Sequence, residues 1–157
     1  MIFAAGLGTR LKPLTNTMPK ALVPVVGKPL LQHTIEKLIA AGFDEIIINI
    51  HHFADQIIHF VKANNQFGIR IAFSDERAQL LDTGGGIKKA AWFFDDNRPF
   101  LVHNTDILST IDLREVMRHH LQNDAPATLV CSMRETNRYL LFNEQQYLYG
   151  WINRKTG

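Results

Sequence analysis

The sequence of 157 residues predicts an α/β fold built around a mostly parallel sheet. Two observations support this prediction. Strand-like apolar runs alternate along the chain with segments of helical spacing, which is typical of β and α elements that follow one another around a parallel sheet. The length is also close to the roughly 150 residues of one typical domain. We therefore expect residues 1–157 to form a single domain.

The first half of the chain predicts a strand, helix, strand, helix and strand in that order. From Pro29 to Ala41 the apolar residues share one helical face, and Gly42 supplies a stop. The run from Glu45 to Ile50 is β-branched and apolar, as expected of a strand covered on both faces. The remaining expected elements are a strand over Ile2 to Ala5, a helix from Phe53 to Asn64 and a strand from Ile69 to Phe73.

The second half continues the alternation and ends in a hairpin. Asp112 is a suitable N-cap for a helix through Leu121, because its carboxylate can accept from a free helical N–H group. The other expected elements are an amphipathic segment from Ile87 to Phe94, a strand over Phe100 to Val102, a buried strand over Ala127 to Ser132 that would enclose Cys131, and a C-terminal β-hairpin of Tyr139 to Phe142 with Tyr147 to Ile152.

Composition excludes several classes of protein. Hydrophobic residues make up 46% and charged residues 20%, which excludes disordered, collagen-like and coiled-coil chains. The single cysteine, Cys131, cannot form an intrachain disulfide, so we expect a reducing, cytoplasmic location. No apolar run approaches the roughly 18 residues of a membrane span, and the first residues lack the features of a signal peptide. We therefore expect a soluble protein with no membrane partner.

The charge is +2 in total but unevenly placed. No acidic residue precedes Glu36, whereas the same segment carries four basic residues, Arg10, Lys12, Lys20 and Lys28. The segment also holds Gly6 and Gly8, directly after the first strand. Glycines there let backbone N–H groups approach a phosphate, and basic side chains add countercharge. This arrangement predicts an anionic ligand, although a short Gly-x-Gly alone also occurs in plain surface loops.

The longer pattern around these glycines is more specific. Gly-x-Gly-Thr-Arg-Leu-x-Pro-Leu-Thr from Gly6, followed by Pro-Lys-Ala-Leu-Val-Pro up to Pro24, resembles the signature of sugar-1-phosphate nucleotidyltransferases. The resemblance implies a Rossmann-like, three-layer α/β/α fold. It also implies that Lys20 lies near the reacting phosphate of a nucleoside triphosphate. The expected loop contacts with the nucleotide come from Ala4, Ala5, Gly6, Gly8, Thr9 and Arg10.

A second glycine-rich segment spans Leu81 to Ile87. Three glycines that open a helix leave free N–H groups that a ligand could approach, although a plain helix-entry loop has the same appearance. The segment resembles the Leu-Gly-Thr-Ala-Gly element of the same family, in a triple-glycine form similar to that of N-acetylmuramate-1-phosphate uridylyltransferases. The resemblance implies contacts with the nucleoside from Thr83, Gly84 and Gly85, and from Glu76 to the base, where a solvated loop carboxylate is the alternative.

A third candidate is Asp106, at the end of the strand that precedes it. Ligands of open α/β sheets bind beyond the carboxyl ends of the strands, and carboxylate oxygens suit Mg²⁺. An Asx-turn is the structural alternative. The segment from His103 to Asp106 resembles the Asn-Gly-Asp element of the family, with Thr105 in the place of the glycine, and this implies that Asp106 is a metal ligand.

Together these features predict an enzyme that transfers a nucleoside monophosphate from a triphosphate to a sugar 1-phosphate, with Arg10, Lys20 and Asp106 as catalytic residues and Mg²⁺ as cofactor. The alternative is a nucleotide-binding module, regulatory or inactive, without transfer activity. A metal-dependent hydrolase lacks a candidate nucleophile. Uridylyl transfer to N-acetylmuramate 1-phosphate is favoured slightly over guanylyl transfer to mannose 1-phosphate. We expect no nucleic-acid partner. We also expect that the chain lacks a C-terminal sugar-binding part. The sequence does not indicate an oligomeric state.

Overall fold

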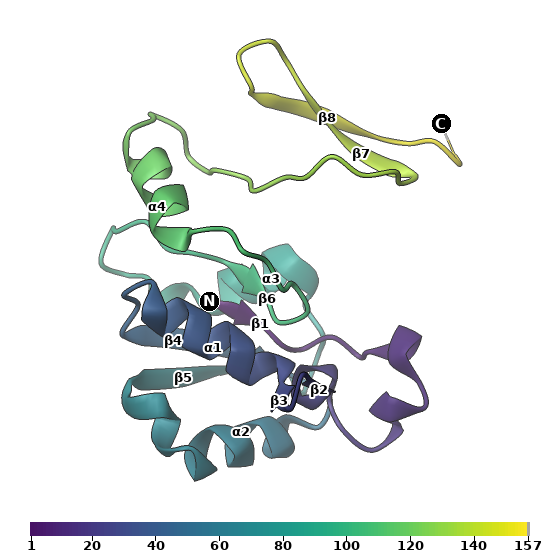
Figure 1. The fold of residues 1–157 in the computed structure, drawn as a ribbon, viewed down its shortest axis with the longest axis vertical. Helices are drawn as coiled ribbons and strands as arrows, with labels where there is room; N and C mark the ends of the chain where they lie inside the picture. The colour runs from purple at the N-terminus through teal and green to yellow at the C-terminus, as the bar shows by residue number, and fades with distance from the viewer. Residues whose placement is uncertain (157) are drawn as a thin grey trace. The chain divides into compact units, whose positions relative to one another are not determined.

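The computed structural model describes residues 1–156 and divides the chain into two compact units, an N-terminal unit of Met1–Asp124 and a C-terminal unit of Ala125–Gly157. The N-terminal unit holds four longer helices, which Figure 1 labels: α1 (Leu30–Ala40), α2 (Ala54–Ala63), α3 (Asp82–Lys89) and α4 (Leu113–Leu121). It also holds short 3-10 turns, η1 (Thr9–Leu11), η2 (Leu14–Asn16), η3 (Lys20–Leu22), η4 (Asn65–Gly68) and η5 (Ala91–Phe93).

A parallel sheet forms the centre of the N-terminal unit. Its strands are β1 (Ile2–Phe3), β4 (Glu45–Ile50), β5 (Arg70–Asp75) and β6 (His103–Asn104), in the spatial order β5-β4-β1-β6. Chain order therefore runs outward from β1 to one edge and then returns to its other side. In doubly wound folds this reversal between β1 and β6 is the switch point at which ligands bind. A small antiparallel pair, β2 (Pro24–Val25) with β3 (Lys28–Pro29), lies outside this sheet.

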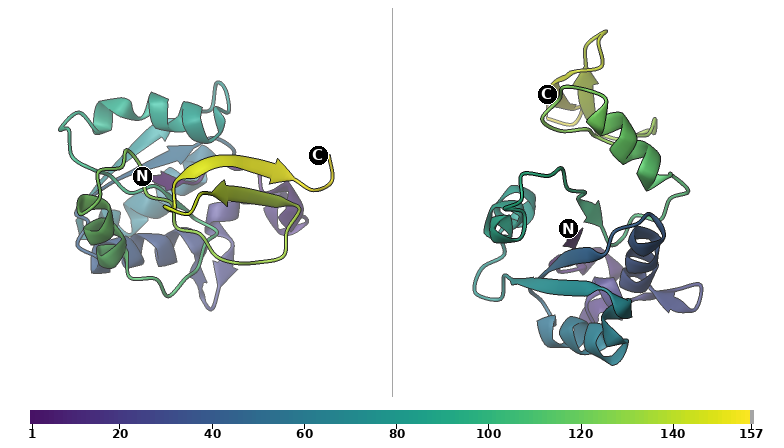
Figure 2. Two further views of the ribbon diagram at one scale, coloured as in Figure 1. Left: turned by 90° about the horizontal axis from the view of Figure 1, so that it is seen from above. Right: turned by 90° about the vertical axis from the view of Figure 1, so that its left-hand side faces the viewer.

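The two faces of the sheet are covered by different helices, as Figure 2 shows for α1 and α3. Alternate residues of β4 point to opposite faces. Ile46, Ile48 and Ile50 join the larger core with the apolar residues of α1 and α2. Ile47 joins a smaller core beside α3 and η5. The three-layer α/β arrangement predicted from the sequence is therefore confirmed, and β4 is buried on both sides as expected.

Most of the predicted helices and strands are confirmed, but the strand expected over Phe100 to Val102 is not formed. The strand here is His103–Asn104, because the register with β1 begins where His103 pairs with Ile2. The Asp112 side chain accepts from the Arg114 N–H at 2.8 Å and so caps α4. The glycine run was expected to precede its helix, but the structure places Gly84, Gly85 and Gly86 inside α3. The difference arises because tertiary contacts, described below, fix a segment whose glycines have low helix propensity.

The C-terminal unit contains the predicted hairpin, β7 (Arg138–Phe142) and β8 (Leu148–Asn153), paired in antiparallel register. The expected strand at Ala127 to Ser132 is not formed, and the prediction of a buried Cys131 is wrong because that residue is exposed. An apolar run becomes a buried strand only where a neighbouring strand bonds to it and a second layer covers it. Within residues 1–156 no strand pairs with this run. Whether residues 1–157 form one domain stays a prediction.

Candidate active site

The site lies at the carboxyl ends of β1 and β6, the two strands on either side of the switch point. Ile2 is in register with His103, and Phe3 with Asn104. From β1 the chain continues through Ala4 and Ala5 into Gly6–Arg10, which we call the first glycine segment. From β6 it continues into Thr105 and Asp106. Thr105 ties the two exits together, since its hydroxyl donates to the Phe3 carbonyl at 2.9 Å. A threonine in place of the family's glycine thus adds a bond between the two strands.

The structure brings Lys20 and Asp106 into contact, although 86 positions separate them in the sequence. Lys20 begins η3, and its ammonium group forms an ion pair with the Asp106 carboxylate. The side chains are 22% and 40% exposed, so a ligand in solution can reach both. An ion pair that stays accessible can exchange its partners for the phosphates and the cation of a nucleotide complex. Two of the three predicted catalytic residues therefore share one site.

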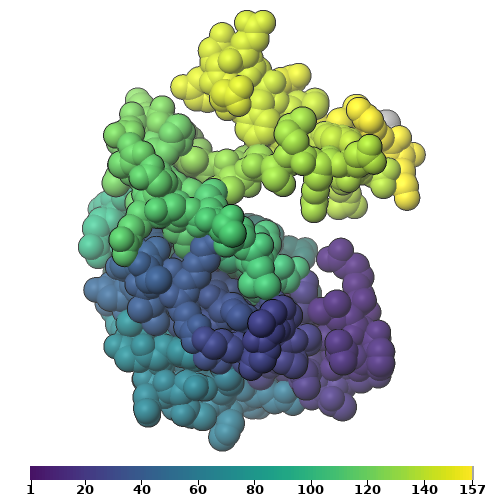
Figure 3. All heavy atoms as spheres, viewed as in Figure 1, coloured from purple at the N-terminus to yellow at the C-terminus, as the bar shows by residue number. Residues whose placement is uncertain are grey.

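The first glycine segment lies at the surface, where the purple N-terminal part of the chain is visible in Figure 3. Gly8 has a left-handed backbone, with φ of 66°. Its carbonyl accepts from the Thr15 hydroxyl at 2.9 Å and from the Leu11 N–H at 2.9 Å. A Cβ at Gly8 would lie 2.9 Å from Thr15 Cγ2 and 3.0 Å from Lys20 Cβ. The glycine therefore lets the loop pack directly against the residue that carries the predicted catalytic amine.

Other predicted residues of this loop differ in their accessibility. Arg10 and Thr9 are exposed in η1, and no ion pair within residues 1–156 engages Arg10. Gly6 is exposed as well, and its N–H makes no hydrogen bond in the described chain. Ala4 and Ala5 are 4% exposed, and both of their N–H groups donate to Asn49 Oδ1, at 2.7 and 3.2 Å. Gly6 thus offers a free donor, whereas Ala4 and Ala5 bind the protein interior.

The second glycine segment forms the start of α3. Thr83 and Gly84 are exposed, and no side chain caps the N-terminus of this helix. The N–H groups of a first helical turn have no partner within the helix, and the helix dipole makes them attractive to anions and to carbonyl oxygens. Gly86 is buried, and a Cβ there would lie 2.9 Å from Glu76 Oε1 and 3.2 Å from Asn49 Nδ2. Gly85 is closely packed as well, since a Cβ there would lie 2.9 Å from Leu81 Cβ, whereas Gly84 has open space.

Glu76 lies between the two glycine segments and is completely buried. Its Oε1 accepts from Asn49 Nδ2 at 2.9 Å, and its Oε2 accepts from the Leu81 N–H at 3.2 Å. Its main-chain carbonyl accepts from His51 Nδ1 at 2.7 Å. The carboxylate is thus directed into the protein, and the expected contact between Glu76 and a base stays a prediction.

The His103 imidazole contributes no positive charge at the strand exit at pH 7. Burial lowers the pKa of His103 below its ordinary value, which keeps its imidazole neutral at pH 7 beside the strand end. Its Nδ1 donates to the Asn104 carbonyl at 2.7 Å, because a carbonyl oxygen can only accept. The positive charge beside Asp106 therefore comes from the ammonium group of Lys20.

Asn49 and Thr15 are the site residues that sequence analysis missed. Asn49 is the one polar residue within the buried run Ile46–Ile50, and an amide at the end of an apolar strand is a signal that could have been used. Thr15 is the last residue of the longer pattern that begins at Gly6, and it is buried between exposed neighbours. Both residues act on the loop through its backbone.

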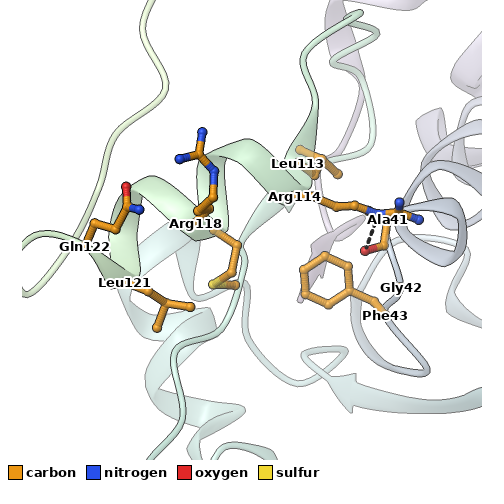
Figure 4. A pocket seen from close by; sticks show the side chains of 9 residues that line it. Ala41, Gly42, Phe43, Leu113, Arg114, Arg118, Leu121 and Gln122 are labelled. Carbon is orange, nitrogen blue, oxygen red and sulfur yellow. Dashed lines mark hydrogen bonds between the residues drawn. The ribbon is translucent and has the colours of Figure 1, made fainter.

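A cavity of about 450 Å³ lies elsewhere, between the end of α1 and helix α4. Figure 4 shows Phe43, Leu113 and Leu121 around it, with Arg114 bonded to the Ala41 carbonyl at 3.3 Å. Phe43 precedes the amino end of β4, so the cavity lies near the amino ends of the strands, away from the carboxyl ends where the candidate site lies. None of the predicted site residues lines it.

Comparison with known proteins agrees with the fold. A family model described as nucleotidyl transferase matches residues 1–142. N-acetylmuramate alpha-1-phosphate uridylyltransferase of Caulobacter vibrioides is 47% identical over 108 residues, which are 68% of this chain and 44% of that protein. Mannose-1-phosphate guanyltransferase of Yarrowia lipolytica is 35% identical over 142 residues, 88% and 39% of the two chains.

A solved structure gives the same result. HddC from Yersinia pseudotuberculosis, complexed with GMP-PN, superposes with a TM-score of 0.75 at 26% identity, and the match covers 98% of this chain and 68% of HddC. The chain spans less than half the length of the two curated relatives just described. The sequence signature, the strand order and these matches agree, and the chain belongs to the nucleotidyl transferase family.

Proposed function

We propose that the protein transfers a nucleoside monophosphate from a nucleoside triphosphate to a sugar 1-phosphate. The observation that supports this most strongly is the contact between Lys20 and Asp106 at the switch point, beside the exposed glycine loop. A lysine and a carboxylate that meet at the strand exits are suited to a phosphate and a hard cation, respectively. The relatives described above carry names of such transferases.

Uridylyl transfer to N-acetylmuramate 1-phosphate is the preferred specificity. The uridylyltransferase relative is 47% identical, against 35% for the guanyltransferase, although its match is shorter. The three consecutive glycines at the start of α3 also resemble the corresponding segment of N-acetylmuramate-1-phosphate uridylyltransferases. Guanylyl transfer to mannose 1-phosphate is the second candidate.

In the proposed reaction a phosphate oxygen of the sugar 1-phosphate attacks the α-phosphorus of UTP. A new P–O bond forms, the bond to the bridging oxygen of the β-phosphate breaks, and pyrophosphate leaves with that oxygen. Lys20 stabilises the charge that develops at the α-phosphate, while Gly8, Thr9 and Arg10 hold the β- and γ-phosphates. Rate enhancement then comes from positioning and charge neutralisation. The nucleoside lies toward Gly6 and toward Thr83, Gly84 and Gly85 at the start of α3, while Ala4, Ala5 and Glu76 support these residues from the protein interior.

The residues present fit a magnesium ion. Asp106 supplies an accessible carboxylate at the strand exit, and within residues 1–156 no cluster of three or more acidic, histidine or cysteine ligands is formed. Mg²⁺ commonly binds through one or two carboxylates together with substrate phosphates, so a single carboxylate is sufficient on the protein side. When bound, the ion neutralises phosphate charge.

We also propose a cytoplasmic location. No helix within residues 1–156 has the length and apolar character needed to cross a bilayer. The single cysteine is exposed, as suits a reducing compartment such as the cytoplasm.

The test is pyrophosphate release by this chain with UTP and N-acetylmuramate 1-phosphate, and with GTP and mannose 1-phosphate. We expect K20A and D106A each to lower turnover by roughly 10²-fold or more, since each removes charge stabilisation at the reacting phosphates. K62A is the matched control, because Lys62 is an exposed lysine in the last turn of α2 and belongs to neither glycine segment. Its turnover should equal that of the wild type.

Near-normal turnover in K20A or D106A would contradict the role assigned to that residue. Binding of a triphosphate without pyrophosphate release, with either sugar phosphate, would instead identify a nucleotide-binding module.

A further inference from the structure

The α3 face of the sheet contains a continuous series of hydrogen bonds between the two glycine segments. The N–H groups of Ala4 and Ala5 donate to Asn49 Oδ1 at 2.7 and 3.2 Å. Asn49 Nδ2 donates to Glu76 Oε1 at 2.9 Å, and the Leu81 N–H donates to Glu76 Oε2 at 3.2 Å. Asn49 is 2% exposed and Glu76 is 0% exposed, so water does not compete for these bonds.

This series has a fixed direction. Backbone N–H groups can only donate, and they occupy both ends of the series. The Asn49 amide accepts on the loop side and donates on the helix side, so the last group must accept twice. A carboxylate meets this requirement with its two oxygens, whereas a glutamine would bring a second NH₂ group against the Asn49 amide or the Leu81 N–H. The chemistry therefore specifies Glu at position 76.

We infer that Asn49 and Glu76 are positioning residues that fix the first glycine segment relative to the start of α3, and so form the nucleotide site from two separate parts of the chain. This inference rests on the proposed function. The pair contacts Ala4 and Ala5 directly before Gly6, and Leu81 directly before α3. Glu76 acts on the nucleotide through these backbone groups.

Gly86 completes the contact between α3 and the pair formed by Asn49 and Glu76. It is buried on α3, and a Cβ there would lie 2.9 Å from Glu76 Oε1, 3.1 Å from Phe3 Cε1 and 3.2 Å from Asn49 Nδ2. A hydrogen atom in that place lets α3 lie against both members of the polar pair and against β1. The helix is thus held by close packing on one turn and by the Leu81 N–H at its start.

The direction of the series supplies a sharp test, the exchange variant N49D/E76Q. In E76Q the new NH₂ group faces a donor, and in N49D two carboxylates face one another, so each single variant breaks the series. In the double variant the introduced carboxylate can accept from Ala4 and Ala5 and also from the introduced amide, whose oxygen accepts from Leu81. The middle bond is reversed and both ends are satisfied.

The measurement is calorimetric titration of each variant with UTP and Mg²⁺, at a temperature where circular dichroism shows every variant folded. Each single variant leaves a buried donor without its acceptor and so loosens the site, and we expect it to bind UTP about tenfold more weakly or worse. The double variant should recover most of that loss. I57V is the control, because Ile57 is fully buried in the core on the opposite face and its truncation lowers stability without touching the series.

The outcomes distinguish failure of the positioning role from failure of the proposed function. UTP affinity of E76Q within twofold of the wild type would overturn the inference while leaving the proposed function intact. Failure of the exchange variant to recover affinity, with both single variants impaired, would overturn the directional link. A wild-type chain that binds neither UTP nor GTP would overturn the proposed function, and the positioning role with it. Weaker UTP binding in I57V equal to that in E76Q would show a general stability effect and would also overturn the inference.

Discussion

The two glycine-rich segments of the N-terminal unit use glycine for different physical reasons. In the first, Gly8 has φ of 66° and packs against Thr15 and the base of Lys20. In the second, the glycines have helical backbone within α3, and only Gly86 is pressed against Glu76 and Asn49. Gly84 has no atom within 4 Å of the place where a Cβ would stand. Gly8 is thus required by its backbone conformation, Gly86 by close packing, and Gly84 by neither. Substitution of each by alanine distinguishes these three cases.

The largest effect is expected from G8A. An L-residue in the left-handed region costs roughly 1 to 2 kcal/mol, and the added Cβ would contact Thr15 and Lys20 at 2.9 to 3.0 Å. We expect the free energy of unfolding to fall by about 3 kcal/mol, with a loss of turnover because Lys20 must shift. Urea denaturation followed by circular dichroism measures the first quantity. A stability equal to that of the wild type would show that Gly8 does not need its conformation.

An intermediate effect is expected from G86A. Alanine favours a helix over glycine by about 1 kcal/mol, but overpacking against a buried bonded pair costs roughly 1 to 3 kcal/mol. The net loss of stability should be about 1 kcal/mol, accompanied by weaker UTP binding as Glu76 is pushed from Asn49. Denaturation and calorimetry on the same sample separate the two effects. Increased stability with unchanged UTP binding would mean that the helix start adapts freely.

The smallest effect is expected from G84A, and its sign is opposite. Gly84 is exposed on α3 with space for a Cβ, so alanine should raise the free energy of unfolding by about 0.5 to 1 kcal/mol. UTP affinity should decrease only if a nucleoside lies against this surface in the bound state. A clear loss of stability would refute the view that Gly84 is unconstrained within the folded chain.

Sequence alone predicted the elements whose patterns are local. The helix through Ile35 and Leu38, the strand Glu45–Ile50 and the Asp112 cap each depend on spacing or on a neighbouring residue, and each is present. The expected strand at Ala127 to Ser132 depends on a partner strand that an apolar pattern cannot supply. The close packing of Gly86 within α3 could not be predicted, because it depends on residues distant in the sequence, notably Glu76 and Asn49.

The candidate site also contains residues that local sequence patterns identified and contacts that only the fold creates. The signature from Gly6 to Lys20 identified the loop, and the position of Asp106 after a strand indicated the second half. Their meeting depends on the strand order β5-β4-β1-β6, which places β1 beside β6. The link through Asn49 was not foreseen, because its partners Ala4 and Glu76 are 45 and 27 positions away along the chain.

The central claim is that the two glycine segments form one nucleotide site at the strand exits, and amide NMR tests it most directly. The ¹⁵N–¹H resonances of Gly6, Gly8 and Gly84 can be followed as UTP and Mg²⁺ are added to this chain. The account predicts that all three shift along one binding curve with a single dissociation constant, while resonances around the cavity at Phe43 and Met117 stay in place. Shifts confined to one segment, or to the cavity, would contradict it.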